Sequence, residues 1–145
     1  MSSTNLLTPH SPVFTWPVRV YWEDTDAGGV VYHASYLRFL ERARTEWLRA
    51  QKIHQTQVRE RDNVVFVLRD LSIEFVKPAR LDDELRVTLE SVERRSASMT
   101  FSQFILRAAD NDVLIRAKVR VACVSADAFQ PCRIPANLFT ETPTA

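Results

Sequence analysis

Hydrophobic and polar residues alternate near the start of the chain in the manner of a β-strand. Within residues 14–22, apolar side chains occupy every second position: Phe14, Trp16, Val18 and Val20. A period of two places these side chains on one face of a strand. Because Pro17 lacks an N–H donor, we expect this strand at a sheet edge or at a strand start.

The period changes to that of an α-helix between residues 33 and 52. Apolar side chains recur there at steps of three or four: Tyr36, Phe39, Leu40, Ala43 and Trp47. Arg42 and Glu46 form an oppositely charged i,i+4 pair on another face. The pattern predicts one amphipathic helix of about five turns, with its aromatic residues in the core.

Strand patterns fill the rest of the chain. Residues 64–68 and 71–75 alternate on opposite phases, and the slip around Arg69 and Asp70 predicts a bulge. Further apolar segments cover residues 85–89, 99–106 and 113–123. A helix followed by antiparallel strands predicts an α+β fold, with the helix on one face of the sheet.

Composition indicates one continuous domain. The chain has 145 residues, of which 46% are hydrophobic, and no internal repeat or linker divides it. We expect a folded domain over residues 12–139, a flexible tail over residues 1–11 and a second tail over residues 140–145. The net charge of +1 provides no sequence-wide basic field for binding nucleic acid or an anionic membrane.

Targeting signals are not apparent either. No basic start followed by an apolar run indicates export, and no apolar stretch is long enough to predict membrane insertion. Cys123 and Cys132 form no C-x-x-C pattern, and a domain of this size does not need disulfides. We therefore expect a cytoplasmic protein.

The segment with the clearest chemistry surrounds the chain's two glycines, Gly28 and Gly29. They allow a tight loop between the first strand and the helix, which leaves the first N–H groups of the helix facing a cleft. Such N–H groups suit a developing oxyanion. Asp26 is close enough to His33 in sequence to face the same cleft and to attack a substrate or activate water. The alternative is an acidic turn whose glycines serve backbone geometry alone.

Spacing excludes several other sites. A calcium loop starting at Asp24 would need an oxygen ligand at Gly28 and a glutamate at Ser35. With two adjacent glycines the chain has no G-x-S-x-G, Walker A or dinucleotide motif. The three histidines show no zinc spacing, so we expect no catalytic metal.

Two segments resemble a known family. Residues 18–49, with Ala34-Ser35-Tyr36-Leu37 after the glycine loop, and residues 78–83, Pro-Ala-Arg-Leu-Asp-Asp, are similar to the hotdog-fold 4-hydroxybenzoyl-CoA thioesterases. Within that family, the chain is most similar to the bacterial Tol-Pal-associated acyl-CoA thioesterases. The likeness covers nearly all of the expected folded part.

The resemblance implies a hotdog fold, in which an antiparallel sheet wraps one long central helix. It also implies a homo-oligomer, either a dimer with joined sheets or a homotetramer, whose active sites lie at subunit interfaces. The expected reaction is hydrolysis of acyl-CoA to a free acid and CoA without a cofactor. By this resemblance Asp26 is the nucleophile or general base. The backbone N–H of His33 polarises the thioester carbonyl, and the His33 side chain helps to place the substrate.

The chain departs from its expected relatives at Trp22, where they commonly carry a tyrosine. An indole cannot accept a hydrogen bond, so Trp22 is expected to shape the acyl pocket or to pack at an interface. Glu23 and Asp24 are interpreted as solvated turn charges or helix-dipole partners rather than as catalytic groups.

The phosphates of CoA need local cations. Arg94 and Arg95, in a polar turn between two strands, are the candidate contacts, although an ordinary solvated hairpin also explains them. Lys77 and Arg80 are weaker candidates of the same kind.

Two other functions stay open at this point. One is an interaction protein with weak hydrolysis, which would hold acyl carrier protein or phospholipid-synthesis enzymes near the envelope. The other is a hotdog dehydratase, which usually pairs a histidine with an acid from the partner helix. Here Asp26 precedes His33 in one loop, which favours hydrolysis.

Overall fold

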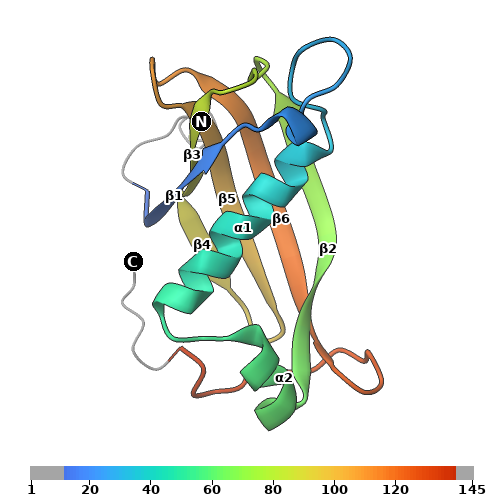
Figure 1. Cartoon of the computed structure of the whole chain (residues 1–145). Helices are drawn as coiled ribbons and strands as arrows, with labels where there is room; N and C mark the ends of the chain where they lie inside the picture. The colour runs from blue at the N-terminus through green and yellow to red at the C-terminus, as the bar shows by residue number, and fades with distance from the viewer. Residues whose placement is uncertain (1–11, 140–145) are drawn as a thin grey trace.

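The chain folds into one antiparallel sheet that curves around a long helix (Figure 1). The structure is a computed structural model and describes residues 12–139, so both expected tails lie outside the described residues. The elements are β1 (Phe14–Arg19), the 3-10 turn η2 (Trp22–Asp24), α1 (Ser35–Ala50), α2 (Gln55–Asp62), β2 (Val64–Phe75), β3 (Glu84–Leu89), β4 (Ser91–Arg94), β5 (Ser98–Arg107) and β6 (Val113–Ser125). The α+β class and the hotdog arrangement are confirmed.

The strands follow the order β1-β3-β5-β6-β2, and β4 pairs with β5 beside this path. The pairing of β2 with β6 is the longest in the sheet, and its register shifts between Leu68 and Asp70. This shift confirms the bulge that the change of phase predicted. Since β6 is the strand that β2 pairs with in the described sheet, the other edge of β2 is open to pairing.

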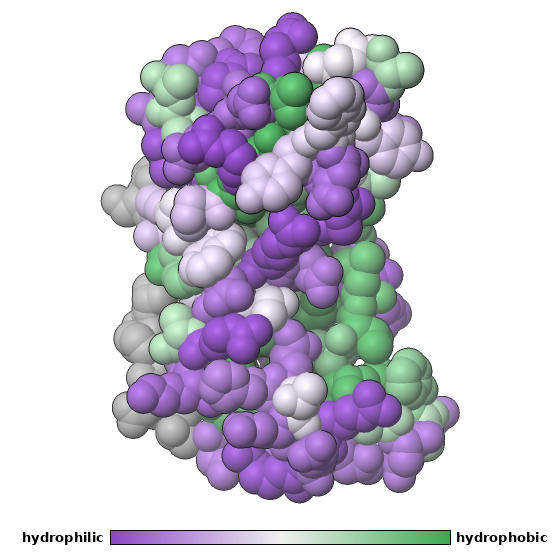
Figure 2. Space-filling model, viewed as in Figure 1, coloured by the Kyte–Doolittle hydropathy of each residue, from purple (hydrophilic) through white to green (hydrophobic). Residues whose placement is uncertain are grey.

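Helix α1 packs its apolar stripe onto the concave face of the sheet. Phe39, Leu40 and Ala43 are buried, and the small Ala43 allows close approach to the strands. Gln103 of β5 donates to the carbonyl oxygen of Leu40 at 3.2 Å, which satisfies polar groups inside this contact. The opposite face is hydrophilic, and it forms the purple band that crosses the surface in Figure 2.

Some boundaries differ from the sequence expectation. Strand β1 ends at Arg19 rather than at Trp22. After Arg19 the backbone leaves the strand pairing, because the N–H of Val20 bonds the carbonyl oxygen of Asp83, which lies in a loop. Helix α1 is shorter than residues 33–52, and the second helix, α2, was not predicted. None of the helices in residues 12–139 is long and apolar enough to cross a membrane.

Candidate active site

The glycine-containing loop folds into a miniature hairpin between η2 and α1. Thr25 pairs with Val31, and the N–H of Asp26 donates to the carbonyl oxygen of Val30 at 2.9 Å. The tip closes where the N–H of Gly29 donates to the carbonyl oxygen of Asp26 at 3.0 Å. Gly29 has a φ of +82°, a left-handed conformation that side chains with a Cβ disfavour. The tight loop predicted from the two glycines is therefore present.

The loop orients the carboxylate of Asp26. The N–H of Gly28 donates to Oδ1 of Asp26 at 2.9 Å, and a Cβ at position 28 would lie only 3.2 Å from the same oxygen. Glycine at position 28 thus permits the close approach that this bond requires. Among the described residues, no group hydrogen-bonds the second carboxylate oxygen, and no basic side chain pairs with Asp26. One oxygen is held while the other is available for chemistry.

Asp26 and His33 line the same cleft, which has a volume of about 300 Å³. Its walls come from the loop, from the turn before α1 and its first turn, and from the end of β2 with the segment after it: Asp26, Val30, Val31, His33, Tyr36, Phe75, Val76, Lys77 and Pro78. The segment after β2 is fixed to the loop by backbone bonds, since the N–H of Val31 donates to the carbonyl oxygen of Ala79 at 2.9 Å. The expected proximity of Asp26 to the helix start is therefore present.

The start of α1 leaves backbone donors unused. The N–H of Ser35 bonds the carbonyl oxygen of Tyr32 at 2.8 Å, whereas the N–H groups of His33 and Ala34 find no acceptor within residues 12–139. The first N–H groups of a helix carry partial positive charge and attract anionic ligands. The His33 side chain is exposed, and its ring lies 4.5 Å from that of Tyr32. His33 thus combines a backbone N–H without an acceptor in residues 12–139 with an exposed side chain, at a position that lines the cleft.

Asp24 corrects one expectation, because it is only 4% exposed and is not a solvated turn charge. Its Oδ2 accepts the N–H of Tyr21 at 2.8 Å, and its Oδ1 accepts Nη2 of Arg38 at 3.3 Å. Its carbonyl oxygen accepts the N–H of Tyr32 at 2.8 Å. Asp24 therefore joins η2 to the helix start, whereas Glu23 is exposed as expected.

Trp22 does not shape a pocket within the single chain, because the residue is 81% exposed. Its backbone caps the short turn instead, since its carbonyl oxygen accepts both the N–H and the hydroxyl of Thr25. A packing role for the indole would need a second subunit or another partner.

The cationic candidates fall into two groups. Lys77 lines the cleft and pairs with Asp112 at 2.9 Å. Arg94, the last residue of β4, and Arg95, in the turn to β5, lie at the end of the molecule opposite the Asp26 loop (Figure 1). The Arg94 guanidinium lies 4.4 Å from the centre of the Phe139 ring. The structure therefore does not bring these two arginines to the cleft of their own chain.

Tyr36 lines the candidate site, whereas the sequence reasoning placed it in the core and did not assign it to the site. It is buried, as predicted, but it also lines the cleft. Its hydroxyl accepts the N–H of Ala79 at 3.0 Å, and burial, partly offset by this bond, raises its pKa. Its position three residues after His33, one helical turn away, is the signal that would have revealed it.

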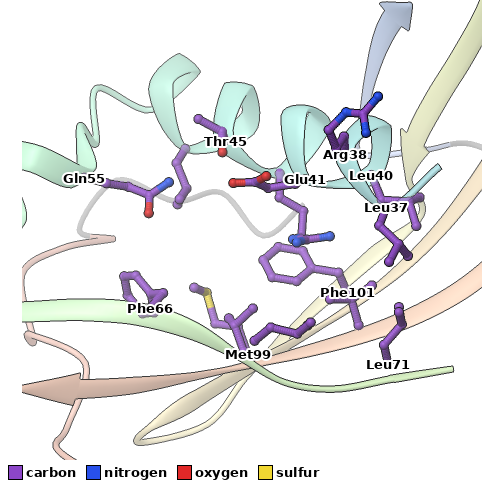
Figure 3. Close-up of a pocket in the computed structure, with 15 residues that line it drawn as sticks. Leu37, Arg38, Leu40, Glu41, Thr45, Gln55, Phe66, Leu71, Met99 and Phe101 are labelled. Atoms are coloured by element: carbon purple, nitrogen blue, oxygen red, sulfur yellow. The ribbon is translucent and has the colours of Figure 1, made fainter. Parts of the chain in front are cut away.

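A second cavity, also of about 300 Å³, lies farther along α1. Figure 3 shows Phe66, Met99 and Phe101 of the sheet facing α1 across it. Arg44 also lines this cavity and donates to Oε1 of Gln103 at 3.1 Å. Burial lowers the pKa of Arg44 to about 10, with nearby Glu41 partly offsetting the effect.

The two cavities follow the same elements. Tyr36 in the cleft and Leu40 in the second cavity are one helical turn apart on α1. Phe75 in the cleft and Leu71 in the second cavity are four residues apart on β2, so they share one face of the strand. The second cavity therefore continues the line of the cleft between α1 and β2.

Comparison with known proteins identifies the family. The sequence pattern of the Thioesterase-like superfamily matches residues 20–140. The acyl-CoA thioester hydrolase YbgC of Escherichia coli O6:H1 is 46% identical over 132 residues, which cover 91% of this chain and 97% of that protein.

Solved structures agree with this match. A probable thioesterase from Bartonella henselae has a TM-score of 0.77 and 36% identity, covering 83% of this chain and 98% of that one. The fold is also that of Slr0204, a 1,4-dihydroxy-2-naphthoyl-CoA thioesterase from Synechocystis, with a TM-score of 0.80, 24% identity, and coverage of 89% and 96%. The chain therefore belongs to the Thioesterase-like superfamily of hotdog-fold proteins.

Proposed function

We propose that this protein hydrolyses acyl-CoA thioesters to a free acid and CoA. The observation that carries the proposal is a single cleft lined both by Asp26 and by His33 at the helix start. One carboxylate oxygen of Asp26 accepts a hydrogen bond from Gly28, and the other accepts none from the described residues. The names of the YbgC relatives, which are acyl-CoA thioester hydrolases, support the choice of substrate.

In this mechanism the thioester carbonyl points its oxygen at the N–H of His33. As the carbonyl carbon becomes tetrahedral, this N–H stabilises the negative oxygen. One such donor in an ordered site contributes about 3 kcal/mol of transition-state stabilisation. Collapse of the intermediate breaks the C–S bond, and the CoA thiolate leaves and takes up a proton. The hydrogen bond from Gly28 keeps Asp26 aimed at the carbon during these steps.

Asp26 has two routes to this intermediate. As a nucleophile, it attacks the carbonyl and forms a mixed anhydride, which water then hydrolyses. As a general base, it removes a proton from water while the water oxygen attacks. A single turnover in ¹⁸O-labelled water tests the nucleophilic route: if water opens the anhydride at the Asp26 carboxyl carbon, the free acid leaves with an unlabelled oxygen from Asp26 and Asp26 keeps the label, whereas the general-base route places the label in the free acid. Label that accumulates in Asp26 over many turnovers would show that it attacks covalently and that water opens the anhydride at its carboxyl.

The acyl group is proposed to extend from the cleft toward the second cavity. The support is the shared α1 and β2 walls described above, which continue from Tyr36 to Leu40 and from Phe75 to Leu71. Hydrolysis rates across short, long and aromatic acyl-CoAs would show which acyl groups this space accepts.

We further propose that the protein is a homodimer, or a dimer of dimers, joined through the open edge of β2. Leu68 and Phe75 of this strand are 56% and 52% exposed, although both are large apolar residues. Figure 2 shows green, apolar surface beside the hydrophilic band of α1, on the side where Figure 1 places β2. Pairing with a second copy would satisfy the edge and cover these side chains.

Arg94 and Arg95 are retained as proposed CoA phosphate contacts only across a subunit interface, since neither lines the cleft and the β4–β5 hairpin end lies opposite the Asp26 loop in Figure 1. Neutralising both would then raise KM and leave kcat unchanged.

We also propose a cytoplasmic location. The support is that Cys123 and Cys132 form no C-x-x-C motif and that a domain of this size does not need disulfides.

The decisive test is Asp26→Asn, assayed as thiol release from a panel of acyl-CoAs. The amide keeps the size of the side chain and the Oδ1 acceptor for Gly28, but it can neither attack nor accept a proton from water. We expect thiol release to stop while the fold persists. Asp127→Asn, an exposed aspartate in the turn after β6, is the matched control and should keep full activity. Thiol release by Asp26→Asn at the wild-type rate would refute the assignment. A wild-type protein that binds acyl carrier protein but releases no thiol would favour the interaction-protein function.

A further inference from the structure

The Tyr36 hydroxyl has a donor that the rest of the protein does not use. The residue is 3% exposed, and the centre of its ring lies 6.2 Å from that of Phe39 and 5.9 Å from that of Phe75. The hydroxyl oxygen accepts the N–H of Ala79 at 3.0 Å. A tyrosine hydroxyl can also donate one hydrogen bond, and within residues 12–139 no acceptor receives it.

An unused donor in a buried position costs free energy, so buried hydroxyls normally find a partner. Tyr36 borders the cleft that contains Asp26 and His33, and a molecule bound there is available as the acceptor. Side chains on a helix lean toward its N-terminus, so the phenol of Tyr36 extends toward the turn that carries the His33 N–H.

We propose that the Tyr36 hydroxyl is a second hydrogen-bond donor of the active site, which donates to the thioester oxygen as negative charge develops there. This inference rests on the proposed thioesterase function. The N–H of Ala79 polarises the hydroxyl, because a hydroxyl that accepts a hydrogen bond becomes a better donor. No bond to Tyr36 forms or breaks, and its proton stays on the phenol oxygen throughout.

The raised pKa of Tyr36 fits this role, since the phenol keeps its proton at neutral pH. Charged groups near the hydroxyl must be considered when its titration is used as a test. They are Arg107, Asp83 and Asp26, together with the cleft residues His33 and Lys77. The competing explanation is that the hydroxyl merely anchors the Ala79 segment.

The first experiment is Tyr36→Phe, which removes one oxygen atom. We expect kcat for acyl-CoA hydrolysis to fall about 100-fold, with little change in KM, because the bond strengthens in the transition state. Tyr21→Phe is the matched control, since Tyr21 is 61% exposed and lies outside the cleft; its kcat should stay at the wild-type value. If Tyr36→Phe lowers only the unfolding temperature and keeps kcat, the hydroxyl is an anchor and the inference is wrong.

A second experiment keeps the hydroxyl and changes its acidity. Fluorotyrosine, introduced at position 36 alone by amber suppression, retains the contact with Ala79 but has a lower phenol pKa. Because the donor is lost when the phenol ionises, we expect the fall of kcat at alkaline pH to move to lower pH. An anchoring role predicts no such shift. If the pH at which kcat falls on the alkaline side stays the same, the inference is overturned even if Tyr36→Phe fails to fold.

Failure of this inference is distinguishable from failure of the proposed function. If the wild type releases no thiol from any acyl-CoA, the function itself is wrong. If the wild type is active, Asp26→Asn is inactive and both Tyr36 variants behave as the wild type, only the role of Tyr36 is wrong.

Discussion

Replacing each of the adjacent glycines with alanine perturbs the Asp26 loop in a different physical way. At Gly29 the difficulty is conformational, because its φ is +82° and a Cβ there would meet nothing within 4 Å. A left-handed conformation costs a residue with a Cβ about 1 kcal/mol. For a domain of this size, we expect Gly29→Ala to lower the unfolding temperature by about 4 °C.

At Gly28 the difficulty is steric and local. Gly28 has no positive φ, but a Cβ would lie 3.2 Å from Oδ1 of Asp26. The carboxylate can move by a few tenths of an ångström, so the unfolding temperature should change little. That movement disturbs the bond from the Gly28 N–H and the aim of Asp26. A misplacement of about 1 Å costs about 100-fold in rate, so we expect kcat to fall about 10-fold for this smaller shift.

The assay combines thermal unfolding by circular dichroism with acyl-CoA hydrolysis for both variants and the wild type. Gly28→Ala should lose mainly kcat, and Gly29→Ala mainly thermal stability. Equal losses of unfolding temperature in the two variants, with normal turnover in Gly28→Ala, would show that the loop does not position the Asp26 carboxylate.

Three further predictions concern other parts of the fold. Burial, and then the neighbouring Cys132, raises the pKa of the Cys123 thiol to about 12. Because alkylation needs the thiolate, iodoacetamide at pH 8 should modify Cys132 and should not modify Cys123 until the protein unfolds. Peptide mass spectrometry would detect which cysteine is modified. Arg107→Gln should destabilise the protein by about 1–3 kcal/mol in urea unfolding, since Arg107 binds Asp83 and the carbonyl oxygen of Pro78, and an unchanged midpoint would contradict this. Leu68→Lys should place like charges together across a β2 dimer and yield monomers in analytical ultracentrifugation, whereas a dimer of normal affinity would exclude this edge.

The period of the hydrophobic residues was sufficient to predict the helices and strands that bury one face. Phe39, Leu40 and Ala43 recur at helical spacing because α1 packs against the sheet, so the sequence pattern predicted this helix. Helix α2 contains one buried residue, Val58, and no comparable stripe. Its end at Asn63, with a φ of 56°, depends on a left-handed residue rather than on hydrophobic spacing. Such a helix cannot be predicted from apolar periodicity.

The candidate site was predictable where it depends on local sequence. Asp26 and His33 are joined by a short loop, so their common cleft followed from the glycines between them. The participation of Tyr36 depends on Ala79, far away in the sequence, which approaches only when β2 and the segment after it have folded. The burial of Asp24 likewise depends on Arg38 of the helix, and an acidic residue in a polar stretch gives no sign of such a partner.

Ala79 has a consequence for how ligands reach the cleft. Its N–H binds the Tyr36 hydroxyl and its carbonyl oxygen binds the N–H of Val31, and the residue itself is fully buried. These two hydrogen bonds join the helix, the hairpin and the connecting segment, so moving the helix or the hairpin would break one of them and moving the connecting segment would break both. Because these bonds hold the walls of the cleft in place, the cleft is open before a ligand arrives. Ligands therefore enter by diffusion, without the movement of a lid.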